Sequence, residues 1–245
     1  MNTNGNIYTI IYTTLIVVVV AGILAAAASF LKPSQQANIK AETISQMLQA
    51  AQFDTQGMNN VQKLDKYAEE IESAFIIDAE GNKLRDLGVT RDAIELEDGL
   101  KAQNYAIAGK DGYTVGLPVY VLKGGVTLIP CYGAGLWGPV WGYIAIEPDG
   151  TTIKGAYFDH ESETAGLGAR IKDDPAFRAQ LVGKKIAWEE VPLFEIVKGG
   201  APEGRENAID AITGATMTSK GLDAAISTWL AAYKPYFINL NKEEE

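Results

Sequence analysis

The chain has 245 residues and a formal net charge of −10, from 21 Lys and Arg against 31 Asp and Glu. This acidic balance argues against a nucleic-acid partner, which needs a basic surface. The content of 47% hydrophobic and 21% charged residues argues against a disordered chain. The single cysteine, Cys131, excludes an intramolecular disulfide framework, and the single histidine, His160, leaves few ways to build a metal site. Redox chemistry would therefore need an organic cofactor or a partner's metal.

The N-terminus predicts a membrane anchor. After a short polar tail at residues 1–6, residues 7–31 are dominated by Ile, Val, Leu and Ala, and no charged residue precedes Lys32. As a helix this run is about 37 Å long, enough to cross a bilayer core. A cleaved signal peptide needs a basic start and a shorter apolar core, so a retained transmembrane helix is favoured, although Ala25–Ser29 leaves cleavage open. We expect Lys32-Pro33 to end the helix.

Residues 33–112 are expected to form a juxtamembrane helical segment and an insert. Apolar residues at helical spacing predict helices over 34–52 and near 61–73. A strand is expected at 75–78, followed by a turn, and residues 83–112 are polar and weakly patterned.

Residues 113–240 are expected to form the main domain, followed by an acidic tail at 241–245. Strands are predicted at 115–122, 141–147 and 151–158, and Pro148–Gly150 has the composition of a hairpin turn. A short helix is predicted at 174–181, and a last helix is expected to be stopped by Pro235. This order predicts an α+β fold, with a largely antiparallel sheet and flanking helices.

Three segments could carry chemistry, and the first is Asp210–Lys220. Four hydroxyl residues surround Gly214 just before the last helix, where free backbone N–H groups and the helix dipole can hold a phosphate. The simpler interpretation is ordinary helix capping by Thr216, Thr218 or Ser219.

The second and third segments are Gly133–Gly142 and His160–Gly168. Glycines let a backbone approach a planar ligand, and Trp137 and Trp141 supply flat apolar surface, although a bend with core tryptophans explains the pattern equally well. Glu163 and Thr164 could bond a polar ring edge or ribityl hydroxyls, or they could lie in a solvated loop.

Together the three segments resemble the membrane-anchored FMN-binding domain family, and within it the group of C subunits of the Na⁺-translocating NADH:quinone oxidoreductases. That resemblance implies FMN joined through its phosphate to a threonine by a flavin transferase. The matching threonine is Thr216, and Asp210 stands at the acidic position of the motif. Ala165 departs from the proline usual in the family. The other positions implied to bind the cofactor are Thr213, Gly214, Ala215, Glu163, Thr164, Leu167 and Trp137.

The resemblance further implies an electron-carrying subunit without a complete active site of its own. It would pass electrons through covalent FMN to partner subunits, during NADH-to-quinone transfer coupled to Na⁺ export. The family places its FMN domain outside the cytoplasm, on a single-pass anchor in the bacterial inner membrane. Lys32 and Lys40 alone weakly favour the opposite orientation.

Two alternatives remain at this point. The G subunit of an Rnf-type electron-transport complex shares the anchor and the threonine motif, although the long segment 34–112 better suits the quinone reductase. A membrane-anchored extracytoplasmic binding module without redox activity would use the Thr213–Ser219 cluster only as a cap. No Gly-x-Gly-x-x-Gly run lies between a predicted strand and a predicted helix, so we do not expect the chain to bind NADH itself.

Overall fold

The computed structural model describes residues 5–243, and the chain divides into two units, Met1–Glu42 and Thr43–Glu245. Helix α1 (Asn6–Ala50) begins in the first unit and ends in the second. Of the two predicted tails, residues 1–4 and 244–245 lie outside the described residues. The described part of the acidic tail continues the last helix to Glu243.

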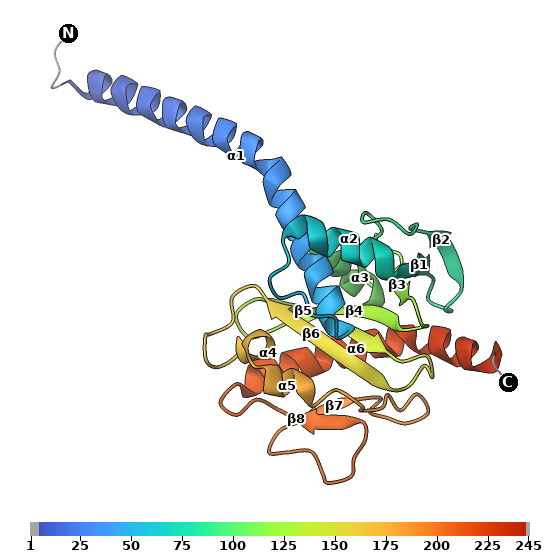
Figure 1. Ribbon diagram of the computed structural model, residues 1–245. Coiled ribbons are helices and arrows are strands. Elements are labelled where there is room, and N and C mark those ends of the chain that lie inside the picture. The colour runs from blue at the N-terminus through green and yellow to red at the C-terminus, as the bar shows by residue number, and fades with distance from the viewer. Residues whose placement is uncertain (1–4, 244–245) are drawn as a thin grey trace. The chain divides into compact units, whose positions relative to one another are not determined.

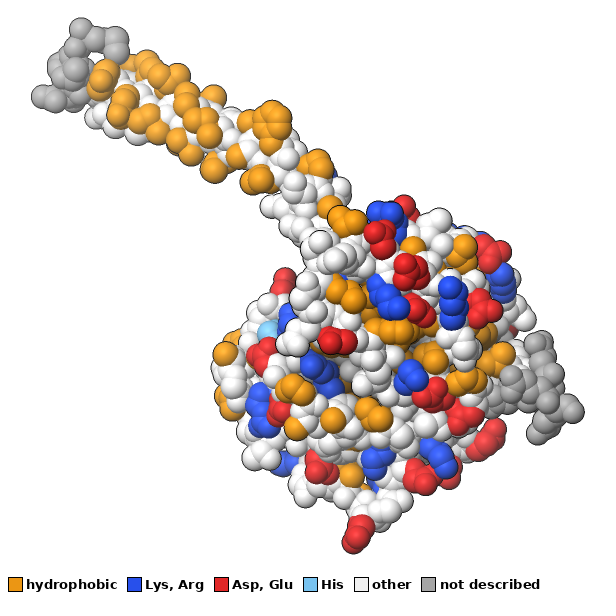
Figure 2. All heavy atoms as spheres, viewed as in Figure 1, with side chains coloured by type: hydrophobic (Ala, Val, Ile, Leu, Met, Phe, Trp, Pro, Cys, Tyr) orange, Lys and Arg blue, Asp and Glu red, His pale blue; other side chains and the backbone are white. Residues whose placement is uncertain are grey.

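The first unit contains the apolar part of α1. One 18-residue stretch has a mean hydropathy of 2.6, and none of it is buried against the rest of the chain. Figure 2 shows no blue or red side chain along this part of the helix. Length and composition therefore fit a single-pass membrane anchor.

The prediction that Pro33 ends this helix is wrong, because α1 continues through Pro33 to Ala50. Proline removes one N–H donor and crowds the carbonyl four residues earlier, but it leaves the other hydrogen bonds of the flanking turns in place. The last helix shows the same behaviour: α6 (Thr216–Glu243) contains Pro235 and is not stopped by it.

The second unit is built on a six-stranded antiparallel sheet with the order β2-β1-β3-β4-β5-β6 (Figure 1). Hairpins with short turns join β3 to β4, β4 to β5 and β5 to β6. The strands are β1 (Ile71–Ile77), β2 (Lys83–Asp86), β3 (Leu117–Leu122), β4 (Thr127–Ala134), β5 (Pro139–Ile146) and β6 (Ile153–His160).

Helices cover both faces of this sheet. On one face the last turns of α1 and α2 (Asn60–Glu70) pack against alternate strand residues such as Tyr120, Tyr143 and Tyr157. On the other face α6 and α3 (Glu97–Ile107) pack against the intervening residues, among them Val119 and Ile144. Successive side chains of a strand point to opposite faces of the sheet, so each strand contributes residues to two separate cores.

The remaining elements are short and lie between β6 and α6. They are α4 (Arg170–Asp173), α5 (Pro175–Ala179) and a parallel pair of strands, β7 (Glu195–Val197) and β8 (Ala208–Asp210). The predicted helix at 174–181 corresponds to α5, which begins with Pro175 and is capped by the Asp174 side chain.

Several sequence expectations need correction. The second helix ends at Glu70 and not at 73, so β1 begins at Ile71, ahead of the predicted strand at 75–78. The weakly patterned segment 83–112 contains β2 and α3. Segment 133–142 includes the hairpin between β4 and β5, and β4 itself was not expected from the sequence. The sheet contains strands from before and after residue 112. The division of the chain at that residue into an insert and a main domain stays a prediction.

Helix α6 makes a buried polar contact with the sheet and a part-buried one with α3. The Tyr233 hydroxyl donates to the Pro118 carbonyl of β3 at 2.6 Å, and Trp229 Nε1 donates to Asn104 Oδ1 of α3 at 3.1 Å. Burial raises the pKa of Tyr233 well above its ordinary value, so this hydroxyl stays protonated and able to donate.

We expect Tyr233→Phe to lower the free energy of unfolding by about 1 kcal/mol, because it removes one buried hydrogen bond and leaves the ring in place. Chemical denaturation of the full chain in detergent measures this loss. The matched control is Tyr113→Phe at an exposed tyrosine, which should have little effect. Equal stabilities of the two variants would contradict the expectation.

Candidate functional site

One cavity lies where the β4–β5 hairpin, the loop after β6 and the start of α6 meet. Its volume is about 400 Å³. This is within the range of small-molecule sites, which is roughly 300–1,000 Å³. It is lined by Leu136, Trp137, Glu163, Thr164, Leu167, Gly168, Gly214, Ala215, Thr216, Met217 and Thr218.

The cavity brings together most of the residues singled out from the sequence. Three segments far apart in the chain contribute them: Trp137 from the hairpin, Glu163, Thr164 and Leu167 from the loop after β6, and Gly214–Thr216 from the entry to α6. Sequence analysis missed four lining residues: Leu136, Gly168, Met217 and Thr218. All four lie inside the three segments singled out from the sequence, but they were not marked individually as cofactor-binding positions.

Asp210 and Thr213 do not line the cavity. Asp210 ends β8, and its Oδ1 accepts the backbone N–H of Ala201 at 2.7 Å. Its own backbone N–H donates to Gln180 Oε1 at 2.9 Å. Asp210 thus braces the loop between β7 and β8, while Thr213 is exposed on the turn that precedes Gly214.

The mouth of the cavity is apolar. Trp137 is 66% exposed, and Leu136, Leu167 and Met217 are also large exposed hydrophobic side chains. Trp137 is therefore not a core tryptophan. Apolar side chains gathered at a cavity mouth are typical of a ligand site.

The Glu163 carboxylate connects two walls of the cavity. It is only 7% exposed. Its Oε1 accepts the backbone N–H groups of Leu136 at 2.7 Å and Trp137 at 2.9 Å, and its Oε2 accepts the Thr218 hydroxyl at 2.6 Å. An ionised carboxylate is an acceptor only, so three donors suit that form.

Glycines make room for this carboxylate. A Cβ atom at Gly135 would overlap Glu163 Oε1, and one at Gly168 would overlap both Glu163 Oε2 and Thr218 Oγ1. These two glycines therefore permit close approach of the protein to its own side chains, and for the segment that contains Gly135 the sequence had suggested close approach to a planar ligand.

The first turn of α6 lacks a side-chain cap within the described residues. Gly214, with φ +84°, turns the chain into the helix, and Ala215 occupies the position before it. Thr218 donates to Glu163, and Ser219 Oγ accepts the Ile212 N–H at 3.1 Å. Between residues 5 and 243 nothing accepts the N–H groups of Thr216, Met217 or Thr218. The interpretation of Thr218 and Ser219 as ordinary caps is therefore wrong.

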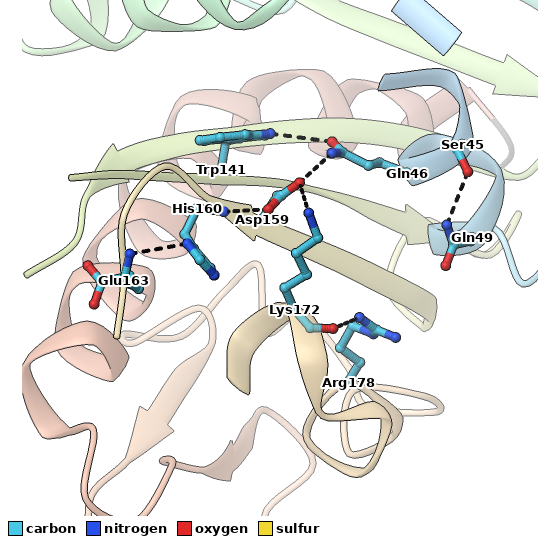
Figure 3. Close-up of polar contacts among 9 residues, drawn as sticks. All are labelled: Ser45, Gln46, Gln49, Trp141, Asp159, His160, Glu163, Lys172 and Arg178. Atoms are coloured by element: carbon cyan, nitrogen blue, oxygen red, sulfur yellow. Dashed lines mark hydrogen bonds and ion pairs between the residues drawn. The ribbon is translucent and has the colours of Figure 1, made fainter. Parts of the chain in front are cut away.

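A polar cluster reaches from α1 to the loop that carries Glu163 (Figure 3). Asp159 Oδ2 accepts from Gln46 Nε2 at 2.7 Å and from Lys172 Nζ at 2.8 Å. Gln46 Oε1 in turn accepts from Trp141 Nε1 at 3.3 Å. At the other end the Glu163 N–H donates to His160 Nδ1 at 3.2 Å. The lone histidine thus serves as a hydrogen-bond acceptor for the cavity loop.

The residues of this cavity fall within an FMN-binding domain, because the family of that description matches residues 135–231. The C subunit of the Na(+)-translocating NADH-quinone reductase of Vibrio parahaemolyticus is 34% identical over 233 residues, covering 85% of this chain and 84% of that protein. Its counterpart in Vibrio campbellii is 37% identical over 213 residues, covering 72% and 80%.

Solved structures agree with these relatives. The crystal structure of the same reductase component from Parabacteroides distasonis superposes with a TM-score of 0.70 at 31% identity, covering 84% of this chain and 96% of that one. The structure of Shewanella oneidensis NqrC gives 0.67 at 27% identity, with 84% and 99% covered. The chain belongs to the NqrC family, the C subunits of the Na⁺-translocating NADH-quinone reductases.

We expect Gly168→Ala to lower the free energy of unfolding by about 1–3 kcal/mol, because the new methyl group displaces the Glu163 carboxylate and the Thr218 hydroxyl. Thermal or chemical denaturation of the full chain measures this loss. Thr164→Ser, at an exposed position of the same loop, is the control and should change stability by less than about 0.5 kcal/mol. A Gly168→Ala variant as stable as the control would show that the loop adapts.

Proposed function

We propose that this chain is the FMN-carrying subunit of a Na⁺-translocating NADH-quinone reductase. In that role it passes electrons between partner subunits during NADH-to-quinone transfer coupled to Na⁺ export. The observation that carries the proposal is the cavity inside the matched FMN-binding domain, which combines an uncapped helix start with apolar walls.

The lining residues fit the parts of FMN. The uncapped N–H groups of α6 and the positive end of its dipole suit a phosphate. Trp137 and Leu167 offer apolar surface to the ring system, and the Thr164 side chain is exposed toward solvent at the loop. Bound FMN supplies reversible electron acceptance, and the chain's own residues bind and orient it.

We further propose that Thr216 forms the phosphoester to FMN. The competing hydroxyls are less suitable: Thr218 is buried and engaged by Glu163, Ser219 is buried and engaged by Ile212, and Thr213 lies outside the cavity. Thr216 is half-buried at the cavity wall and opens α6. A hydroxyl there can be reached from outside while the neighbouring N–H groups receive the phosphate.

The flavin transferase that would attach FMN has to recognise the exposed segment before α6. Asp210 stands on that segment and is exposed, and within the described part of the chain only one of its carboxylate oxygens is engaged, by the Ala201 N–H. We propose recognition by the transferase as its role. The other partners are subunits of the reductase, and neither NADH nor nucleic acid is expected to bind this chain.

Thr216→Ala should abolish covalent FMN while the chain remains folded and membrane-inserted, because the loss of one half-buried hydroxyl at a helix start costs only about 1 kcal/mol. Chains co-expressed with the transferase are analysed by flavin fluorescence of the denatured band and by peptide mass spectrometry. Thr213→Ala is the matched control and should retain the flavin.

Flavin mass on Thr213 or Thr218, or flavin that survives in Thr216→Ala, would overturn the assignment to Thr216. If the wild-type chain carries no flavin at all in its native host, the electron-carrier role fails with it. That second result would favour the binding module without redox activity. The match to the quinone-reductase relatives over 85% of the chain favours that complex over an Rnf-type one.

We also propose that residues 33–245 lie outside the cytoplasm, on a single-pass anchor in the bacterial inner membrane. Support comes from the family resemblance, which outweighs the count of two lysines after the apolar run. An alkaline phosphatase fused after Glu245 should be active, since that enzyme folds only after export, and a green fluorescent protein fused there through the same export route should stay dark. The reverse pattern would place the domain in the cytoplasm.

A further inference from the structure

We propose that Glu163 is a positioning residue whose carboxylate latches two walls of the cavity together, and that it does not serve as a ligand of the flavin. The two walls are the hairpin loop at residues 135–138, here called the Trp137 loop, and the first turn of α6. The inference rests on the proposed function, because it assumes that FMN occupies the cavity between these walls.

The hydrogen bonds of the carboxylate carry this assignment. One oxygen holds two consecutive backbone N–H groups of the Trp137 loop, and the other holds Thr218 of α6. The loop lies 27 residues before Glu163 in sequence and Thr218 lies 55 residues after it. No other side chain in the described part of the chain bonds both walls at once.

The charge of Glu163 strengthens this latch. Among residues 5–240 no Lys, Arg or His forms an ion pair with it, so the carboxylate depends on its three donors for stabilisation. Hydrogen bonds to an ionised group are stronger than neutral ones, and a buried charge that loses its donors is costly. Displacement of either wall therefore removes stabilisation from the same buried group, which couples the two walls.

The backbone around the latch is held as well. The Trp137 carbonyl accepts the Ser162 hydroxyl at 2.7 Å, so the Trp137 residue is bound through both its N–H and its carbonyl. The Glu163 backbone is fixed in turn through His160. The exposed Trp137 ring thus extends from a rigid peptide, which sets its position at the cavity mouth without packing of the ring itself.

This geometry predicts different behaviour for two substitutions. In Glu163→Gln the amide oxygen can still accept the two N–H groups, and the amide nitrogen can donate to the Thr218 hydroxyl. The latch then survives without its charge. In Glu163→Ala all three contacts are lost. A residue that bound the flavin through its negative charge would instead be impaired in both variants.

The first measurement is amide hydrogen exchange of the full chain in detergent, produced without the transferase. Glu163→Ala should raise exchange at Leu136 and Trp137 at least about tenfold, and raise it in the segment 215–222, because the latch no longer protects either wall. Glu163→Gln should stay within about threefold of wild type. The matched control is Glu161→Ala, an exposed carboxylate two residues away, which should change neither segment.

The second measurement uses chains co-expressed with the transferase. Glu163→Ala should carry less covalent flavin and show weaker quenching of flavin fluorescence by Trp137, whereas Glu163→Gln should resemble wild type in both. Unchanged exchange in Glu163→Ala overturns the latch. Equal loss of flavin in both variants, with wild-type exchange in Glu163→Gln, also overturns it and makes the charge a direct flavin contact.

Two further results separate the possible failures. If the wild-type chain accepts no flavin, the proposed function fails, but the exchange comparison still decides whether the latch exists. If Glu163→Ala does not fold, Thr218→Val replaces it, since that variant removes one of the three donors at constant shape. Raised exchange in segment 215–222 of Thr218→Val supports the latch, and unchanged exchange overturns it.

Discussion

The start of α6 lies directly against the end of β4, because glycines stand at both points of contact. A Cβ atom at Gly221 would overlap the Ala134 carbonyl oxygen, and one at Gly133 would come within 2.7 Å of the Ala225 Cβ. With no side chain between the two elements, the helix approaches the sheet at backbone distance. The hairpin that follows β4 is therefore brought beside the first turn of α6, and the cavity lies between them. Any substitution that adds volume at this contact would move both walls of the site.

The two-sided burial of the sheet supports this arrangement. One face is covered by α6 and α3, and the other by α2 and the last turns of α1. Gln46 on α1 also reaches Asp159 at the end of β6, directly before the loop that carries Glu163. The end of the helix that begins as the anchor is thus part of the polar cluster beneath the site. The second unit is held by its two cores, one on each face of the sheet, and loops that follow β4 and β6 line the cavity.

The sequence predicted those parts of the fold that have a strong local pattern. The uncharged run at 7–31, the apolar face of α6 and the turn at Pro148–Gly150 all appear in the structure. Strand β4 escaped prediction because it is buried on both faces, so its residues Thr127–Cys131 show no polar alternation. Strand β2 escaped for the opposite reason, since all four of its residues are exposed. The two prolines inside helices were misjudged because local rules ignore the hydrogen bonds of the flanking turns.

The sequence predicted most of the residues that line the cavity, but not the hydrogen bonds between them. Motif spacing located most of the lining residues, but nothing in the sequence indicated that Glu163 bonds Thr218, because that contact joins residues 55 apart. Thr218 and Ser219 looked like caps for the same reason: their partners become visible only when the chain is folded.

The uncapped start of α6 has a consequence for the maturation of the chain. An omitted cap leaves a helix less stable by about 1 kcal/mol, and here the omission coincides with an open, apolar cavity mouth. A newly made chain therefore lacks this stabilisation at the helix end where we propose that the FMN phosphate binds. A phosphate bound there would give these N–H groups an acceptor, so attachment of FMN would also stabilise the start of the helix. Chains without FMN would then differ from chains with FMN in the local stability of that helix end. This difference is a physical basis on which a cell could distinguish the two forms.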